Sequence, residues 1–372
     1  MLIYILLYFM FYYTLGSGIL YFSQYFNTIG ITGGQSGIIF ALGSLVATGF
    51  QPFLGYINDK TKKTNELLIL LMIMIFVSLF LMNYTLSFEK ILILYTFYSI
   101  AVFSKMPLMD AMSLNTHHTF GKIRLWGSIG FAVGGLVTGK VISTFGAGSF
   151  IYMGMLFSVL TILVIIRIPK TKNIVEKTNE KIDIKGLLSN KKYLISVVVA
   201  MLVLGTNNGH NSYFSVYFED IGGSMTLLGV TIFLMTLSEV PLIALSSKLV
   251  GKKNAEYVVA LSALILGIRW GLYFLIAKPM LVTGSFLLQG ASVGFFFGSA
   301  NLFIKSIVKK NTLSTAIMIF MAAGSLGGMF VQYISGIIIE NGSPVNIYGL
   351  FSVLSFVAYL LMLVNKRVKR TK

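Results

Sequence analysis

The chain has 372 residues, of which 56% are hydrophobic and only 11% are charged. A soluble domain carries about 25% charged residues because its surface faces water, so much of this surface must face lipid. The net charge of +17 does not indicate nucleic acid, because the basic residues fall in short clusters between apolar stretches. The absence of cysteine excludes disulfides, thiolate metal sites and thiol nucleophiles.

Long apolar stretches follow one another along the whole chain. Each approaches the ~20 residues that a helix needs to cross a bilayer, and none alternates as a barrel strand does. The first stretch, MLIYILLYFMFYY, has no basic n-region or cleavage site, so we expect a retained transmembrane helix rather than a signal peptide. The predicted spans of this all-α integral membrane protein are residues 2–27, 35–57, 66–87, 91–113, 123–145, 149–167, 193–218, 225–247, 257–277, 280–305, 313–339 and 345–364.

The basic residues between the spans lie mostly on one side. Alternate loops and the tail on that side hold Lys60, Lys62, Lys63, Lys122, Lys248, Lys252, Lys253, Lys309, Lys310, Lys366, Arg367, Lys369, Arg370 and Lys372. The opposite loops offer only Lys90 and Lys278, with Lys140 near one helix end. Positive loops remain in the cytoplasm, so we predict a multi-pass protein of the cell membrane with both termini cytoplasmic. Anionic lipids are the expected partners of these basic loops.

The longest polar segment, residues 168–192, mixes charges of both signs and separates two sets of six spans. It is typical of a cytoplasmic linker and has room for a short surface helix. We therefore predict an N-terminal six-helix bundle over 1–167, a linker over 168–192, a C-terminal six-helix bundle over 193–364 and a basic cytoplasmic tail over 365–372.

One ten-residue sequence motif occurs twice. YFSQYFNTIG begins at Tyr21 and YFSVYFEDIG begins at Tyr213, 192 residues later. Each is followed by a glycine, by a proline near the end of the next span (Pro52 and Pro241), and by a basic loop. Because six is even, the two copies insert with the same orientation, which predicts two bundles related by a pseudo-two-fold axis along the membrane normal. Convergent aromatic belts at two interfaces are the alternative.

Charged residues inside the spans are candidates for function. A charge at mid-bilayer costs about 2.5–3.5 kcal/mol on insertion scales, so it tends to face a partner or a wet cavity. These residues are Lys105, Asp110, Arg124, Lys140, Glu239 and Arg269. Asp110 and Arg124 have matching depths, so an ion pair between them is feasible, either as part of a site or as a structural pair. Glu239 and Arg269 lie at about 12 and 21 Å from the inner boundary at ~1.5 Å per residue, which leaves their pairing open.

Polar residues share one face of span seven, in LGTNNGHNSYFSVYF. Asn207, His210 and Asn211 follow i, i+3, i+4 spacing. Such a stripe is costly in lipid unless it lines the central pathway, although hydrogen bonding between helices is an alternative. Tyr21 and Gln24 on span one also share a face, and they offer a matching but weaker candidate site for a hydroxylated or aromatic solute.

Two like-oriented six-helix bundles joined by a linker resemble the major facilitator superfamily over the whole chain. Its signature after span two is Gly-x-x-x-Asp-Arg/Lys-x-Gly, and the matching positions here are Gly55, Asp59 and Lys60. Lys62 stands where the second glycine is expected. The second-half copy keeps that glycine as Gly251 but departs from the pattern at Ala244 and Lys248. The resemblance implies that this loop helps to set the balance between inward- and outward-facing states.

A closer resemblance is to the lactose-permease-like, oligosaccharide/proton symporter branch, with its phenylpropionate-type relatives. It is carried by GIIF, QPFLGYINDK, MPLMDA, GKIRLWGSIGF and GIRWG. The resemblance implies that Arg124 contacts substrate in a central cavity, that Asp110 assists it as a substrate or gate residue, and that Arg269 takes part in proton coupling. Span ten departs from the branch, because Gln289 stands near the position of its histidine and the span contains no carboxylate. Protonation is then expected elsewhere, at Asp110, Glu239 or His210.

These observations predict a secondary active transporter that moves a small polar organic solute (a sugar, nucleoside or aromatic acid) by alternating access, coupled to protons as a symporter. GGLVTGK, ending at Lys140, lacks the Ser/Thr of a phosphate loop and lies within a span. No nucleophile-and-base set appears, so we expect neither an enzyme nor a cofactor or metal site, and we expect a monomer. The alternatives are an efflux pump for amphiphilic compounds and a membrane sensor that binds solute without transporting it.

Overall fold

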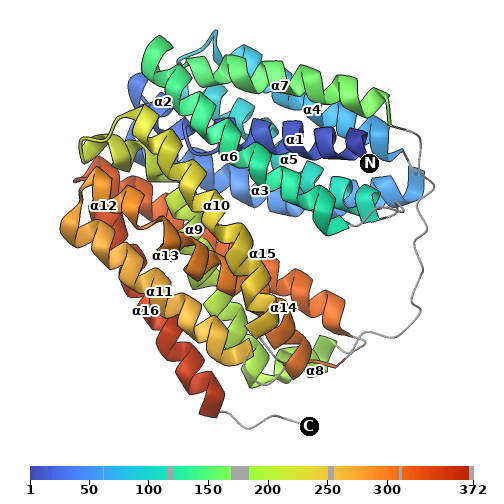
Figure 1. Cartoon of the computed structure of the whole chain (residues 1–372), viewed down its shortest axis with the longest axis vertical. Coiled ribbons are helices and arrows are strands. Elements are labelled where there is room, and N and C mark those ends of the chain that lie inside the picture. The colour runs from blue at the N-terminus through green and yellow to red at the C-terminus, as the bar shows by residue number, and fades with distance from the viewer. Residues whose placement is uncertain (62, 115–119, 169–183, 250–254, 310–311, 368–372) are drawn as a thin grey trace.

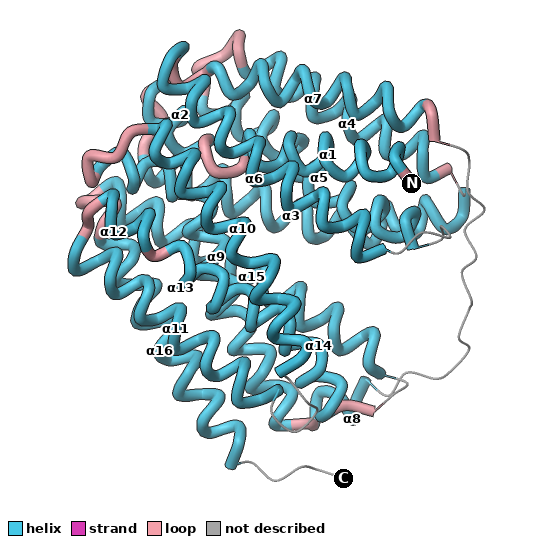
Figure 2. Tube along the Cα trace, viewed as in Figure 1, coloured by secondary structure: helices cyan, strands magenta, loops and turns pink. Residues whose placement is uncertain are grey.

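The structure is a computed structural model of the whole chain, and it describes residues 1–61, 63–114, 120–168, 184–249, 255–309 and 312–367. Within these ranges every regular element is a helix and none is a strand (Figure 2). The helical segments that are long and apolar enough to cross a membrane number 12 in the described part of the chain. The predicted all-α membrane fold with twelve spans is therefore confirmed.

The first half contains α1 (Leu2–Gly18), α2 (Phe22–Thr28), α3 (Gly33–Thr61), α4 (Thr64–Met82), α5 (Phe88–Leu114), α6 (Phe120–Phe145) and α7 (Ser149–Ile166). The short helix α8 (Ile184–Ser189) precedes the second half. That half contains α9 (Lys191–Asp220), α10 (Met225–Leu249), α11 (Ala255–Ile276), α12 (Pro279–Gly284), α13 (Phe286–Gln289), the π-helical turn η1 (Gly290–Gly294), α14 (Phe295–Ile307), α15 (Leu313–Glu340) and α16 (Asn346–Arg367).

Helix ends agree with the predicted spans to within a few residues, with one clear exception. The third span was expected to reach residue 87, but α4 ends at Met82. The residues that follow are polar and form a turn, in which Thr85 Oγ1 accepts a hydrogen bond from the Ser87 backbone N–H at 3.3 Å. Local side-chain hydrogen bonds of this kind compete with the helical ladder and end it.

The spans form two six-helix bundles (Figure 1). One holds α1–α7 and the other α9–α16, and they are related by the predicted pseudo-two-fold axis. The bundles meet near α2 and diverge toward the end of the molecule at which the N-terminus lies (Figure 1). The helices of the two bundles therefore lie close together at one end of the molecule, called the closed end, and are further apart at the other, called the open end.

The repeated motif makes the same kind of hydrogen bond in both bundles. In the first, the Tyr25 hydroxyl donates to the carbonyl of Met82 at 3.2 Å. In the second, the Tyr217 hydroxyl donates to the carbonyl of Tyr273 at 2.9 Å. In each bundle the donor lies in the first span and the acceptor in the third span, as a doubled unit requires and as two independent aromatic belts would not.

A second pair of tyrosines also forms equivalent hydrogen bonds in the two bundles. The Tyr21 hydroxyl donates to the carbonyl of Gly135 on α6 at 2.6 Å, and the Tyr213 hydroxyl donates to that of Gln332 on α15 at 3.0 Å. Both tyrosines are fully buried. Each hydroxyl thus ties the first span of its bundle to the fifth.

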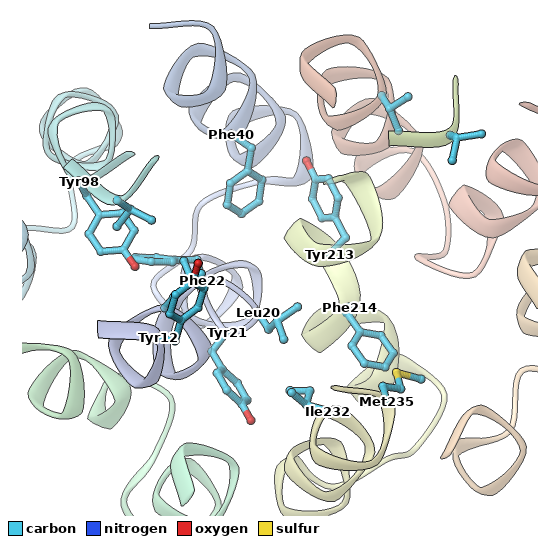
Figure 3. Packing of buried hydrophobic residues seen from close by; sticks show 14 of the residues in the cluster. Tyr12, Leu20, Tyr21, Phe22, Phe40, Tyr98, Tyr213, Phe214, Ile232 and Met235 are labelled. Carbon is cyan, nitrogen blue, oxygen red and sulfur yellow. The ribbon is translucent and has the colours of Figure 1, made fainter. Parts of the chain in front are cut away.

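Glycines allow the bundles to touch at the closed end. A Cβ atom on Gly139 of α6 would lie 2.9 Å from the Cα of Gly229 on α10, and one on Gly336 of α15 would lie 2.7 Å from the Cα of Gly37 on α3. Small residues permit such close helix crossings in membranes. Aromatic rings seal the space between the crossings, and Figure 3 shows Phe40 facing Tyr213 across the interface, with ring centroids 5.3 Å apart.

Candidate functional site

A cavity of about 230 Å³ lies between the bundles, and both halves contribute to its walls. Its polar lining residues are Arg124 and Ser128 from α6, and Asn207, His210, Asn211, Thr236, Glu239 and Gln289 from the second half. Apolar side chains close it toward the bundle contact, where Figure 3 shows Leu20 of one bundle beside Phe214 and Ile232 of the other. A concave site with a few convergent polar groups is the usual form of a small-molecule site.

Gln289 joins the two charged residues of the second half. Its Nε2 donates to Glu239 Oε1 at 2.7 Å, and its Oε1 accepts from Nη1 of Arg269. The amide can do both because it carries a donor and an acceptor group. The pairing that the sequence left open is therefore indirect, with a neutral amide between the carboxylate and the guanidinium.

Arg269 lies behind the cavity wall and is fully buried. Its Nη2 lies 3.2 Å from Nε2 of His210, and its Nε donates to the Tyr273 hydroxyl at 3.1 Å. Its guanidinium also lies 4.2 Å from the ring centroid of Trp270. Arg269 thus reaches the cavity through His210 and Gln289, and its Nη2 also lies 3.9 Å from Sδ of Met235; all three of these residues line the cavity.

His210 is neutral in this arrangement. A guanidinium has donors and no acceptor, so Nε2 of His210 must accept from Arg269. The ring proton is then on Nδ1, which lies 2.9 Å from the Tyr348 hydroxyl. The chain Tyr348–His210–Arg269–Gln289–Glu239 is a continuous polar network whose far end is a carboxylate at the cavity.

The first half has a looser arrangement of charges. Arg124 lies 4.4 Å from the ring centroid of Tyr12, whereas Asp110 accepts a hydrogen bond from the Tyr8 hydroxyl at 2.7 Å. The feasible Asp110–Arg124 ion pair is not formed, because each partner is directed to a different tyrosine of α1. Lys105 is fully buried, with its Nζ 4.1 Å from the Phe11 ring centroid and no hydrogen-bond partner.

The structure brings most of the predicted site residues together. The stripe of Asn207, His210 and Asn211 lines the cavity along with Arg124, Glu239 and Gln289. Tyr21 and Gln24 do not line it in this conformation. The Tyr21 hydroxyl donates to the Gly135 carbonyl. Gln24 is buried where α2 meets α9, and its backbone N–H donates to the Ser215 hydroxyl at 3.3 Å.

The residues of the conformational loop lie far from the cavity. Gly55 and Lys60 belong to the C-terminal part of α3, where Lys60 is exposed and Gly55 has open space around its Cα. The side chain of Asp59 and the whole of Gly251 lie outside the described residues.

Other lining residues were not predicted. Ser128 follows Arg124 by four positions, so helical spacing alone places it on the same face. Tyr12 also lines the cavity, whereas the Tyr348 hydroxyl lies behind it, 2.9 Å from Nδ1 of His210. An aromatic residue in an apolar span gives no sign of whether it faces lipid, core or cavity.

Twelve spans in two bundles around a shared polar cavity are the arrangement of a membrane transporter. The chain matches the model of the MFS_1-like family over residues 1–350. It therefore belongs to this family of the major facilitator superfamily, and it is a multi-pass membrane protein and a solute transporter.

Relatives are found along most of the chain. It is 28% identical to the uncharacterised transporter YwbF of Bacillus subtilis, covering 92% of this chain and 87% of the relative. It is 27% identical to the maltose permease of Geobacillus stearothermophilus, covering 92% and 88%. The probable 3-phenylpropionic acid transporter of Escherichia coli is 27% identical over 45% of this chain and 46% of its own length.

Solved structures share the fold. The nucleoside transporter NupG superposes with a TM-score of 0.85 at 17% identity, covering 99% of both chains. The D-xylose-proton symporter superposes with a TM-score of 0.73 at 16% identity, covering 100% of this chain and 98% of its own.

Proposed function

We propose that this protein is a secondary active transporter that carries a small polar organic solute through the central cavity by alternating access, as a proton symporter. The observation that carries the proposal is the cavity itself, which polar residues of both bundles line and which lies between a closed end and an open one. The relatives named for maltose and 3-phenylpropionic acid, and the nucleoside transporter of the same fold, support a solute of this size class. Similarity to transporters also supports a role other than catalysis.

The open end faces the cytoplasm in this proposal. It is the end at which α1 begins and α16 ends, and α16 finishes in Lys366 and Arg367. Positively charged segments remain cytoplasmic, which supports cytoplasmic termini in the cell membrane and anionic lipid contacts at the basic loops. We retain the proposed division into 1–167, 168–192, 193–364 and 365–372, and a monomer as the working unit.

Alternating access requires the closed end to separate while the open end closes. The contacts that must break include the glycine crossings, the ring of Phe40 against Tyr213 and the hydrogen bond between Ser23 and Ser215. The loop containing Gly55, Asp59 and Lys60, with its second-half copy at Gly251, is the proposed conformational latch at the open end.

Proton coupling is assigned to Glu239 with Arg269 behind it. Glu239 lines the cavity as the terminal acceptor of the polar network. When Glu239 is ionised, Gln289 donates to a charged acceptor, a stronger bond than one to a neutral acid. Protonation weakens that bond and frees Gln289 and Arg269 to rearrange, so proton binding and the shape of the cavity wall are linked.

Counterflow in proteoliposomes tests this function. Purified protein is given a panel of sugars, nucleosides and aromatic acids, and saturable exchange of at least one solute is expected. Arg124→Ala should lower exchange at subsaturating substrate, whereas Arg167→Ala, which alters an exposed arginine at the end of α7, should not. Binding without flux would favour the sensor, and preference for amphiphilic cations would favour the efflux pump. Addition of substrate should alkalinise the medium; sodium dependence without proton movement would contradict the coupling.

A further inference from the structure

The buried charges of the two bundles do not balance. In the second half, Glu239 and Arg269 form one acid and one base joined by Gln289. In the first half, the inward-facing charges described by the structure are Arg124, Lys105 and the single carboxylate of Asp110. No hydrogen bond or ion pair joins Arg124 to an acidic group among the described residues, and an unpaired charge in the middle of the molecule is costly.

Arg124 is the unmatched cation that reaches the cavity. Its guanidinium lines the cavity and lies over the ring of Tyr12, and among the described residues it has no hydrogen bond or ion pair. A guanidinium has five N–H donors in a planar fork suited to a carboxylate. Stacking on an aromatic ring occupies the face of that fork and leaves its N–H edge free. Lys105 is fully buried behind Phe11 and does not line the cavity, so it adds positive potential without offering a contact.

Tyr12 adds a second free donor at the same place. Its ring supports Arg124, it lines the cavity, and its hydroxyl is buried without a hydrogen-bond partner among the described residues. A buried polar group without a partner is destabilising, so such groups in a binding site indicate where a ligand atom belongs. On the opposite bundle, Oδ1 of Asn207 is likewise buried and unpartnered in a residue that lines the cavity.

We propose that the cargo is an organic monoanion whose carboxylate binds Arg124 and the Tyr12 hydroxyl, with its polar remainder directed to Asn207. The inference rests on the transport function proposed above and narrows its substrate class. A single carboxylate matches the one guanidinium among the described residues that line the cavity. A phosphate dianion would need a second cation at the cavity, and Lys105 is not there. A neutral sugar or nucleoside would leave Arg124 without an acid partner in both the empty and the loaded state.

Matched pairs of solutes that differ in one carboxylate test the inference. Counterflow is measured for 3-phenylpropionate against 3-phenylpropanol and for glucuronate against glucose, and the readout is the acid-to-neutral rate ratio within each pair. This ratio does not depend on how much protein is folded and active. A charge-assisted hydrogen bond contributes about 1.5–3 kcal/mol, so the favoured acid should exceed its neutral partner by about tenfold or more.

Variants then assign the preference to its residues. Arg124→Gln should collapse the ratio toward one, Arg124→Lys should preserve part of it, and Tyr12→Phe should lower it severalfold. Arg167→Gln, the control on an exposed arginine of α7, should leave the ratio unchanged.

The outcomes separate the two proposals. Exchange of the neutral member at an equal or higher rate in every transported pair, with no effect of Arg124→Gln on the ratio, overturns the monoanion inference and leaves the transport function standing. Saturable binding of an acid that Arg124→Gln abolishes, with no exchange of any solute, supports anion recognition and contradicts transport. Neither binding nor exchange of any member contradicts both.

Discussion

The hydroxyl groups of Ser23 and Ser215 lie 2.9 Å apart across the bundle contact. These serines occupy the same position in the two copies of the repeated motif, 192 residues apart. Equivalent residues of two related bundles can touch only close to the axis that relates them, so the pseudo-two-fold axis passes near this pair. The motif that indicates the duplication in the sequence thus also lies where the two bundles meet.

A bulky residue at a glycine crossing should open the closed end. Gly229→Leu places a side chain where Gly229 packs against α6, with a Cβ only 2.9 Å from the Leu136 carbonyl oxygen. The bundles must separate to accommodate it, which shifts the population toward an outward-open state. The chain has no cysteine, so Ser128→Cys supplies a unique cavity thiol for an impermeant reagent added from outside.

Labelling of that thiol should rise in Gly229→Leu. Gly49→Leu is the matched control, because Gly49 lies on α3 with nothing within 4 Å of its Cβ position. Equal labelling in both backgrounds would show that the glycine crossing does not hold this end closed.

Removal of the Gln289 amide should disconnect the charged residues of the second half. Gln289→Leu leaves Arg269 and Glu239 without the bonds that join them. An unsatisfied buried partner costs about 1–3 kcal/mol, more for a charged group, so the melting temperature in detergent should fall and proton-coupled uptake should be lost. Gln51→Leu on α3 serves as the control. Uptake with an unchanged ratio of protons to solute would remove Gln289 from the coupling network.

The π-helical turn in span ten should be sensitive to a single methyl group. A Cβ atom on Gly290 would lie 2.6 Å from the Ser238 carbonyl oxygen, beside Glu239, whereas one on Gly284 of the same span would meet nothing within 4 Å. In a helix, alanine is more favourable than glycine by about 1 kcal/mol. Gly284→Ala should therefore keep or raise thermal stability, and Gly290→Ala should lower both stability and transport. A π turn often marks a functional site; equal behaviour of the two variants would argue against that reading here.

Composition and hydropathy were enough to predict the spans. Backbone groups inside a bilayer must be hydrogen-bonded within the chain, so apolar segments of this length form helices that match the bilayer thickness. Composition and hydropathy could not predict where a span departs from α-helical geometry. The change to a π-helical turn after Gln289 goes with Gly290 packing against Ser238 of another helix and with the Ser238 hydroxyl donating to the Phe286 carbonyl at 2.8 Å. Such contacts join residues far apart in the sequence and leave no local pattern.

The sequence predicted those site residues whose helical spacing places them on one face. Asn207, His210 and Asn211 share a face, and that face lines the cavity. Tyr21 and Gln24 also share a face, but a shared face does not say what it packs against. Similar depth likewise suggested the Asp110–Arg124 pair, while the rotation of each helix, which depth does not report, directs the two side chains to different tyrosines.

Linking Ser23 to Ser215 tests the central claim most directly. Their hydroxyl oxygens are close enough for Ser23→Cys with Ser215→Cys to form a disulfide, and the chain adds no other thiol. If the closed end must part in every cycle, oxidation of the double variant stops counterflow, reduction restores it, and neither single variant responds to oxidant. Undiminished counterflow by fully cross-linked protein would contradict alternating access through this cavity.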